Sequence, residues 1–372
     1  MKKFIPVNKP LIEFNDIRAV NKSLKNSWIS SEGPDVVKFE KKFSKYIGHK
    51  YGVAVSSGTA ALEIAIKSLN LKKNDEIIIP NFTIISNLLP ALKFDIKFKL
   101  IDCDLFDWNF NLDKVKQAIN KKTKVIIATH IYNFPIQMNI LKKICLGKKI
   151  TIIEDAAEVL GQKILNKKCG SFGDISTFSF YANKQITTGE GGMITTNNKK
   201  YYEKFKSLRN LAFGKKDRFN HDEIGWNYRI TNVQASLGIS QLNRIDKIVK
   251  KRHEIGKRYF DNLKLNTNLY IPKPKNKFSK NIYWVVAVLI INKNLNLDAS
   301  QLMLKLKKIG IGTRPFFWPM NKQKILKNYN FKKNDFKNSE YISKYGFYLP
   351  SSLSLKRFEI DFICKKLNEI LR

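Results

Sequence analysis

The stretch Phe178-Ser-Phe-Tyr-Ala-Asn-Lys-Gln-Ile-Thr-Thr-Gly-Glu-Gly-Gly-Met193 holds one lysine, Lys184, between an alternating apolar run and a cluster of glycines. The run at 175–180 has the period of a β-strand. The glycines permit a tight turn into a return strand at 193–196. A lysine in such a turn is held in place, as a lysine that forms a Schiff base must be. A solvated loop lysine is the simpler interpretation of this stretch alone, because the chain has many lysines.

Length and composition indicate a protein with a sizeable core. The chain has 372 residues, of which 43% are hydrophobic, and this predicts two domains or one large and one small domain. No apolar run reaches the roughly 18–20 residues of a membrane span, and residues 1–7 lack a signal-peptide core. The four cysteines and four histidines are scattered, which favours reduced thiols in a cytoplasmic protein and no metal site.

The net charge of +37 raises the possibility of nucleic-acid binding. Only 10 of the 68 basic residues are arginines, and the lysines are spread along the whole chain. Proteins that read nucleic acids usually depend on arginine for bidentate contacts. The composition therefore argues against a nucleic-acid partner, while a positive field would attract a small anionic substrate such as a nucleotide diphosphate.

Continuous apolar strands alternate with helical segments through the first half of the chain. Strands are expected near 51–55, 76–80, 98–104, 124–130 and 150–155. This pattern predicts an α/β fold with a mainly parallel sheet covered on both faces. Ligands of such sheets bind beyond the carboxyl ends of the strands. The polar groups expected at that edge are Ser56–Thr59, Thr83, His130 and Asp155.

Two of these groups have both a structural and a functional interpretation. Ser56–Thr59 lies between a strand and an apolar helix, where it forms either a phosphate cradle or an ordinary helix N-cap. Asp155 ends an apolar strand and is costly to bury without a partner. It either caps the segment that follows or holds a proton on a heteroaromatic nitrogen.

The second half of the chain is expected to form a smaller domain. The apolar spacing from Thr231 to Leu263 predicts one long helix. This helix would link a large cofactor-binding domain at 1–245 to a small α+β domain at 246–372. Within the small domain, 282–291 is a predicted core strand and 358–371 a predicted helix.

A phosphate cradle, an acid for a ring nitrogen and a Schiff-base lysine are the three contacts that pyridoxal phosphate requires. At this point the chain resembles the DegT/StrS sugar aminotransferases, a family of the aspartate-aminotransferase fold type (fold-type I). The resemblance covers nearly the whole chain. It rests on Trp28-Ile-Ser-Ser, Ser56-Ser-Gly-Thr-Ala, Glu154-Asp-Ala-Ala-Glu158, Gly170-Ser-Phe-Gly-Asp174, the Lys184 stretch, Gly225-Trp-Asn-Tyr-Arg-Ile-Thr-Asn-Val-Gln234, Thr313-Arg-Pro-Phe-Phe and Leu349-Pro-Ser-Ser. It implies a three-layer large domain and a homodimer with shared active sites.

The resemblance also implies residue roles. Lys184 would bind the cofactor and then carry the proton that is transferred. Asp155 would keep the pyridine nitrogen protonated, and that positive charge would lower the pKa of Asp155. Glu158 would face the 3′-oxygen of the cofactor or the sugar. Further cofactor contacts are implied for Ser57, Gly58, Thr59, Thr83, Ile84 and Ser179, and for Asn227 and Arg229 of the second subunit. Substrate contacts are implied for Trp28, Ser30, His221, Arg314, Phe316 and Phe317.

The implied reaction moves an amino group from L-glutamate to a nucleotide-linked 4-keto-6-deoxyhexose. The product is a 4-amino-4,6-dideoxy sugar of the GDP-perosamine type, for a surface glycan such as an O-antigen. Some positions depart from the family pattern. Phe82 and Ile84 occupy the region of a ring-stacking aromatic residue, and if Ile84 holds that position the ring meets an aliphatic group; Asn133 and Asn321 lie near the expected sugar pocket. The alternatives are a 3-keto sugar substrate and a non-catalytic nucleic-acid-binding regulator. Family members with histidine at the lysine position are dehydratases, and Lys184 disfavours that branch.

Overall fold

A seven-stranded, mainly parallel sheet organises the large domain, as predicted. The computed structural model describes residues 4–132, 134–214, 216–332 and 334–371. The strand order is β1-β9-β8-β5-β4-β2-β3, and only β9 runs antiparallel to its neighbours. The strands are β1 (Tyr51–Val55), β2 (Glu76–Pro80), β3 (Lys97–Ile101), β4 (Thr123–Thr129), β5 (Thr151–Asp155), β8 (Ile175–Ser179) and β9 (Gly192–Thr196). A hairpin of β6 (Lys163–Ile164) and β7 (Lys167–Lys168) lies apart from this sheet.

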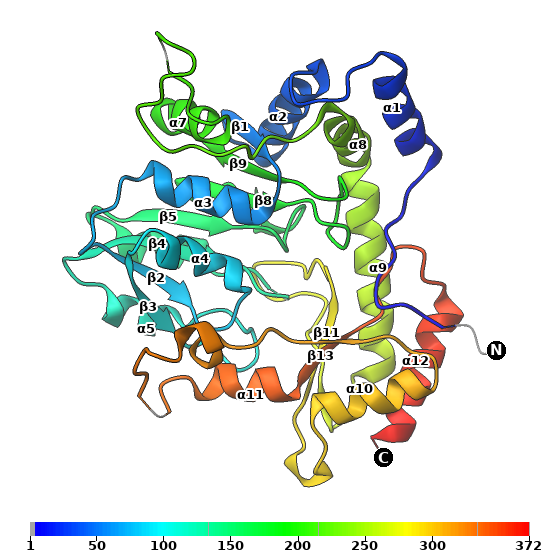
Figure 1. Cartoon of the computed structure of the whole chain (residues 1–372). Helices are drawn as coiled ribbons and strands as arrows, with labels where there is room; N and C mark the ends of the chain where they lie inside the picture. The colour runs from blue at the N-terminus through cyan, green and yellow to red at the C-terminus, as the bar shows by residue number, and fades with distance from the viewer. Residues whose placement is uncertain (1–3, 133, 215, 333, 372) are drawn as a thin grey trace.

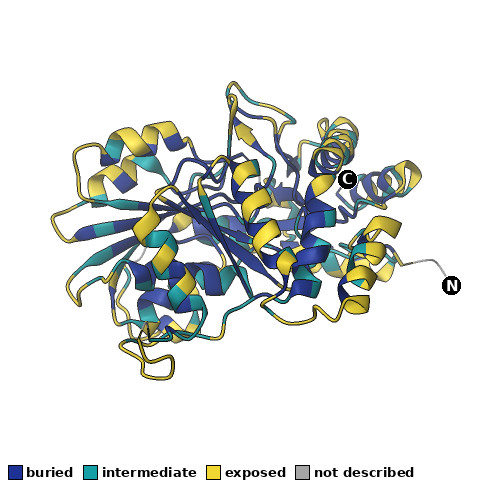
Figure 2. Ribbon diagram, turned by 90° about the horizontal axis from the view of Figure 1, so that it is seen from above, coloured by how far each residue is buried: buried dark blue, intermediate teal, exposed yellow. Residues whose placement is uncertain are grey.

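Helices cover both faces of this sheet, which gives the three layers (Figures 1 and 2). On one face, Phe39 and Phe43 lie 5.2 and 4.9 Å from Phe180 and Phe178, measured between ring centroids. The other face carries a second core built on α3. The helices of this domain are α1 (Phe14–Lys25), α2 (Pro34–Ile47), α3 (Gly58–Ser68), α4 (Leu89–Lys93), α5 (Leu112–Ala118), α6 (Met138–Cys145), α7 (Lys199–Arg209) and α8 (Asn232–Asn243), with a 3-10 turn η1 (Ile85–Asn87).

The prediction of one continuous helix over 231–263 is wrong, although the segment is helical. The chain forms two helices, α8 and α9 (Ile245–Leu263), separated at Arg244. The guanidinium of Arg244 is held by Asp16 and by Glu13 at the start of α1. This anchor fixes the turn, so α8 packs along α1 and α2 while α9 continues toward the small domain (Figure 1).

The small domain is an antiparallel sheet packed on helices, in agreement with the predicted α+β class. The strand order of this sheet is β10 (Leu269–Tyr270), β11 (Val286–Ile290), β13 (Gly346–Leu349) and β12 (Arg314–Pro315). The helices beside it are α9, α10 (Ala299–Lys308), α11 (Lys337–Tyr345) and α12 (Arg357–Ile370), with 3-10 turns η2 (Lys293–Leu295), η3 (Met320–Lys322) and η4 (Lys324–Leu326). The predicted strand at 282–291 is shorter than expected, because Tyr283 has a φ of 47° and β11 begins only at Val286.

Helix α9 contributes side chains to the cores of both domains, and the start of the chain packs with the small domain. Ile245 and Ile248 belong to the large-domain core, whereas Ile255 and Tyr259 belong to the small-domain core. The chain start also joins the small domain, since Ile5 pairs with Ile311. The proposed division at 245/246 therefore falls in the first turn of α9.

A fourth apolar cluster joins the domains beside the carboxyl edge of the large sheet. Phe82, Trp108 and Tyr132 of the large domain pack there with Trp284 and Phe316 of the small domain. Because these rings are buried, the cluster fixes how the small domain stands over the ends of the strands. Among the helices of the described residues, none is long and apolar enough to span a bilayer.

Candidate active site

A cavity of about 310 Å³ opens where the strand ends of the large domain meet the small domain. Thr129, Asp155 and Ser179 enter it from the carboxyl ends of β4, β5 and β8. The small domain closes it with Trp284, Arg314, Phe317 and Tyr348. The other lining residues are Ser57, Gly58, Thr59, Leu62, Ile84, Ser86, Ala157, Glu158, Tyr181, Asn183, Lys184 and Glu190. Ten predicted site residues thus lie around one cavity.

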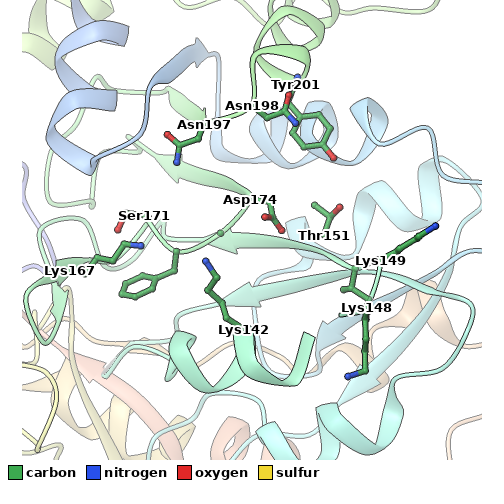
Figure 3. Close-up of a pocket in the computed structure, with 13 residues that line it drawn as sticks. Lys142, Lys148, Lys149, Thr151, Lys167, Ser171, Asp174, Asn197, Asn198 and Tyr201 are labelled. Atoms are coloured by element: carbon green, nitrogen blue, oxygen red, sulfur yellow. Dashed lines mark hydrogen bonds between the residues drawn. The ribbon is translucent and has the colours of Figure 1, made fainter. Parts of the chain in front are cut away.

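A larger hollow of about 740 Å³ lies at the opposite edge of the sheet, where β5 and β8 begin (Figure 3). It is lined by lysines, including Lys142 and Lys167, and Lys148 and Lys149 extend outward from it. The carboxylate of Asp174 there accepts a hydrogen bond from the Ile152 N–H at 2.8 Å. These lysines are exposed, so the hollow is a solvated basic surface, remote from Lys184.

The N-terminus of α3 has the features of a phosphate cradle as well as of a capped helix. Ser57 is the N-cap, and its hydroxyl accepts a hydrogen bond from the Ala60 N–H at 3.0 Å. The first turn carries no acidic residue, so the positive end of the helix dipole faces the cavity unopposed. A Cβ at Gly58 would lie 3.0 Å from the Cβ of Ser179, so glycine keeps this approach open. The hydroxyls of Thr59 and Ser86 lie 2.8 Å apart beside it.

Asp155 lies at the floor of the cavity and is 4% exposed. Its Oδ1 accepts a hydrogen bond from the Ala157 N–H at 3.2 Å, and its Oδ2 accepts one from Asn87 at 3.1 Å. Burial raises the pKa of Asp155, against the opposing influence of the Ala157 N–H and Lys184. The chain alone thus disfavours the ionised form, and the lowered pKa expected from the family depends on a cationic ring. A carboxylate in this position suits a protonated ring nitrogen.

Asn87 is a site residue that sequence reasoning missed. Besides Asp155, its amide donates to Thr83 Oγ1 at 3.0 Å, and its carbonyl oxygen accepts from Thr129 Oγ1 at 3.0 Å. Thr83, predicted to contact the cofactor, is buried behind this amide. The sequence does not single it out, because Asn81, Thr83 and Ser86 are other polar residues of the same segment after β2.

Lys184 lies in the predicted glycine-bounded turn. Its N–H donates to the Tyr181 carbonyl at 2.9 Å, and Gly189 supports the turn with a φ of 80°. Its Nζ lies 3.8 Å from the centroid of the Trp284 ring. Burial lowers the pKa of Lys184, while Glu158 and Asp155 raise it. A lowered pKa increases the neutral amine, which is the form that attacks a carbonyl carbon.

Glu158 forms the cavity wall beside Lys184. Its Oε2 accepts a hydrogen bond from the Tyr132 N–H at 2.8 Å. Burial and the nearby Asp155 raise the pKa of Glu158, and Lys184 opposes this. A carboxyl group with a raised pKa can donate as well as accept a proton near neutral pH.

His130 lies at the carboxyl edge but does not face the cavity. Its Nε2 lies 3.0 Å from Glu154 Oε1, and its Nδ1 accepts from the Ile136 N–H at 3.1 Å. Glu154 also accepts hydrogen bonds from the N–H groups of Gly170, Phe172 and Gly173. This pair holds the 170–173 loop.

Several residues implied by the family resemblance lie outside this cavity in the single chain. Trp28 and Ser30 are exposed, and their carbonyl oxygens accept hydrogen bonds from Asn232. Arg229 is bonded to Asn227 and Asn210. The remaining ones are His221, which contacts the Leu211 carbonyl, Phe316 in the interdomain cluster, and Asn321, which is bonded to Asn81 and Glu340. Asn133 lies outside the described residues. No group of three or more possible metal ligands occurs in the described part of the chain.

A lysine, a buried aspartate and a helix N-terminus around one cavity of this fold define a pyridoxal-phosphate-dependent aminotransferase. The chain belongs to the DegT/DnrJ/EryC1/StrS aminotransferase family, whose model matches residues 10–368.

The chain is similar to two curated relatives along almost its full length. It is 34% identical to the GDP-perosamine synthase of Escherichia coli O157:H7 over 99% of this chain and 98% of that protein. The GDP-perosamine synthase of Vibrio cholerae is 32% identical, with 97% of each chain covered. The motifs predict a sugar aminotransferase similar to GDP-perosamine synthase, and these relatives confirm that prediction.

Solved structures confirm the fold. PseC of Helicobacter pylori, an aminotransferase of pseudoaminic acid biosynthesis, superimposes with a TM-score of 0.93 at 24% identity over 99% of each chain. A variant of GDP-4-keto-6-deoxymannose-3-dehydratase with bound GDP-perosamine gives 0.89 at 25% identity, over 99% of this chain and 100% of that one.

Proposed function

We propose that this enzyme transfers the amino group of L-glutamate to a nucleotide-linked 4-keto-6-deoxyhexose and releases a 4-amino-4,6-dideoxy sugar of the GDP-perosamine type. The observation that carries the proposal is the single cavity onto which Lys184, Asp155 and the α3 N-terminus converge. The GDP-perosamine synthases among the relatives indicate the sugar. A surface glycan such as an O-antigen is the expected destination of the product, made in the cytoplasm.

Pyridoxal phosphate, when bound, supplies an electron sink for the carbon that loses and gains the amino group. Ser57, Gly58, Thr59 and Ser179 would hold its phosphate through hydroxyls and the helix N-terminus. Asp155 would keep the proton on its ring nitrogen. Lys184 would carry the transferred proton on Nζ, aided by a pKa that burial lowers.

The substrate side of the cavity is built by the small domain. Arg314 is exposed at the mouth, and Tyr348 lies beside it on the paired strand. A guanidinium in this position suits the carboxylates of glutamate or the diphosphate of the nucleotide. Phe317 provides an apolar face for the 6-deoxy carbon of the sugar.

The active enzyme is proposed to be a homodimer with shared sites. Asn227 and Arg229 lie outside the cavity of their own chain, and family resemblance assigns them to the neighbouring site. Exposed apolar side chains of the N-terminal region supply a surface for association, among them Phe14 and Ile17.

The test is an amino-transfer assay with L-glutamate and paired 4-keto and 3-keto nucleotide sugars, read by mass spectrometry. The wild type is expected to aminate the 4-keto sugar, and Lys184→Ala to abolish turnover and the visible absorbance of the bound cofactor. Asp155→Asn is expected to lower the rate by more than roughly tenfold. Lys199→Ala, at the exposed start of α7, is the matched control. Amination of the 3-keto sugar alone, or an active Lys184→Ala protein, would contradict the proposal.

A further inference from the structure

Trp284 of the small domain lies directly against the amine of Lys184. The distance from Nζ to the ring centroid is 3.8 Å, which is within the range of a cation–π contact. The indole Nε1 also donates a hydrogen bond to the carbonyl oxygen of Asn183 at 2.8 Å. One side chain therefore contacts both the main chain just before the lysine and the atom at the end of its side chain.

Trp284 is itself held rigidly. It is 4% exposed, and its ring stacks on Tyr132 with centroids 5.9 Å apart and an interplanar angle of 23°. Tyr132 also stacks on Phe317, with centroids 4.9 Å apart and an interplanar angle of 19°. The Phe317 N–H donates to the Tyr132 hydroxyl at 3.2 Å. These three stacked rings come from both domains and hold the indole ring in its position beside Lys184.

The amine has few other partners. Among the described residues, no carboxylate oxygen lies within the 4.0 Å of an ion pair with Lys184 Nζ. The Trp284 ring, 3.8 Å from Nζ, therefore contacts the amine directly and favours its cationic form. A tryptophan needed only to fill space would not have to present its ring face to this atom.

We propose that Trp284 is a positioning residue of the transamination site, whose indole face holds the ammonium form of Lys184 in place when the amine is not bound to the cofactor. The inference rests on the proposed function in one respect, because it gives Lys184 the role of proton carrier. A held amine stays within reach of the carbon from which the proton moves. A free lysine side chain would sample several rotamers.

The charged and titratable groups that face Lys184 come from several elements. Asp155 and Glu158 lie at and after the end of β5, and Glu190 comes from the glycine turn. Arg314 and Tyr348 come from the small domain. Burial lowers the pKa of Lys184, whereas Glu158 and Asp155 raise it. Because a π-face stabilises only the protonated amine, removal of the ring is expected to lower this pKa further.

The experiment compares Trp284→Phe and Trp284→Met in the full-length protein. Each protein is freed of cofactor and treated with trinitrobenzenesulfonate across a pH series, and the Lys184 peptide is quantified by mass spectrometry. In Trp284→Met, which fills space without a π-face, the midpoint of modification is expected to fall by about 0.4 to 1.5 pH units. Trp284→Phe keeps a weaker π-face, so its midpoint is expected to fall by a smaller amount.

An unchanged or raised midpoint in Trp284→Met would overturn the inference, since water entry alone moves the midpoint upward. If that variant fails to fold by circular dichroism, a midpoint in Trp284→Phe equal to that of the wild type decides against it. Trp318→Met is the matched control, because this indole is exposed and bonded to the Lys322 carbonyl.

The reconstituted enzyme supplies the second readout. Trp284→Met is expected to lower kcat by about 2- to 30-fold, and Trp284→Phe by less. A wild type that fails to transaminate would refute the proposed function and leave the modification midpoints as an independent measurement. A wild type that transaminates, with unchanged midpoints in Trp284→Met, would refute the role of Trp284 alone.

Discussion

The side-chain amide of Asn87 donates a hydrogen bond to Oδ2 of Asp155 at 3.1 Å, and the amide is fixed at its other atom by the hydroxyl of Thr129. Asn87 is fully buried. A carboxylate that is costly to ionise when buried is thereby given one donor whose direction is set by the protein. The orientation of Asp155 toward the cavity depends on this amide.

We expect Asn87→Ala to weaken cofactor binding and kcat/KM by about 10- to 100-fold, because a hydrogen bond to a charged group contributes about 1.5–3 kcal/mol. Titration of the cofactor by visible absorbance and the amino-transfer assay measure these effects. Asn266→Ala is the matched control, since that amide is bonded to Asn368 in the small domain. Wild-type cofactor affinity in Asn87→Ala would show that Asp155 is oriented without it.

Glu154 is expected to stabilise the fold rather than the chemistry. It accepts from His130 and from three loop N–H groups, and these bonds lower its pKa against the effect of burial. Glu154→Gln places an amide N–H₂ where acceptors are needed, so the free energy of unfolding should fall by about 3 kcal/mol at pH 7. Urea unfolding measures this change.

The pH dependence of that loss has a definite sign. A carboxyl whose folded pKa is lowered adds stability above its unfolded value, 4.5, and this stability is lost as the pH falls through the folded pKa. The difference between wild type and Glu154→Gln should therefore shrink in acid. Glu223→Gln, which removes a half-buried pair with Lys204, should cost less than about 1 kcal/mol. Equal stabilities of wild type and Glu154→Gln at pH 7 would rule out the assigned role.

Sequence reasoning located those site residues whose position follows from the sheet. Asp155 ends β5 and Ser57 follows β1, and parallel strands bring their carboxyl ends to one edge, whereas Ser179 was implied only by the family resemblance. The strand predicted at 282–291 includes Trp284, because apolar periodicity does not reveal that Tyr283 turns the chain with a φ of 47° before β11. The sequence also does not reveal that His130 pairs with Glu154. Glu154 directly precedes Asp155, and only its bonds to the 170–173 loop distinguish it from a second acid facing the cavity.

Asp107 is predicted to destabilise the folded protein near neutral pH. Burial and the neighbouring Asp104 raise its pKa to about 6 from 3.8. Because the folded pKa exceeds the unfolded one, the penalty is fully present above about pH 6 and disappears below pH 3.8. Asp107→Asn should therefore raise the free energy of unfolding by up to about 3 kcal/mol at pH 7 and by little at pH 4. Asn retains an oxygen to accept from the Asn109 N–H.

Thermal and urea unfolding at both pH values check this prediction, with the exposed Asp113→Asn as control. A gain of the same size at pH 7 and pH 4 would point to packing rather than charge as its cause.

Phe82 and Ile84 occupy the region where the family resemblance implies an aromatic residue above the cofactor ring, and of these two Ile84 lines the cavity. Its side chain lines the cavity and is 45% exposed, so there is room for a larger group. Ile84→Tyr is expected to tighten cofactor binding by about 2- to 12-fold, because an aromatic pair adds about 0.5–1.5 kcal/mol beyond area burial. Ile140→Tyr on α6, at 42% exposure, is the matched control and should leave cofactor affinity unchanged. Cofactor affinity is measured by absorbance titration of protein freed of cofactor. Weaker binding in Ile84→Tyr would mean that the aliphatic side chain fits this cavity, closed by Trp284 and Phe317, better than a ring does.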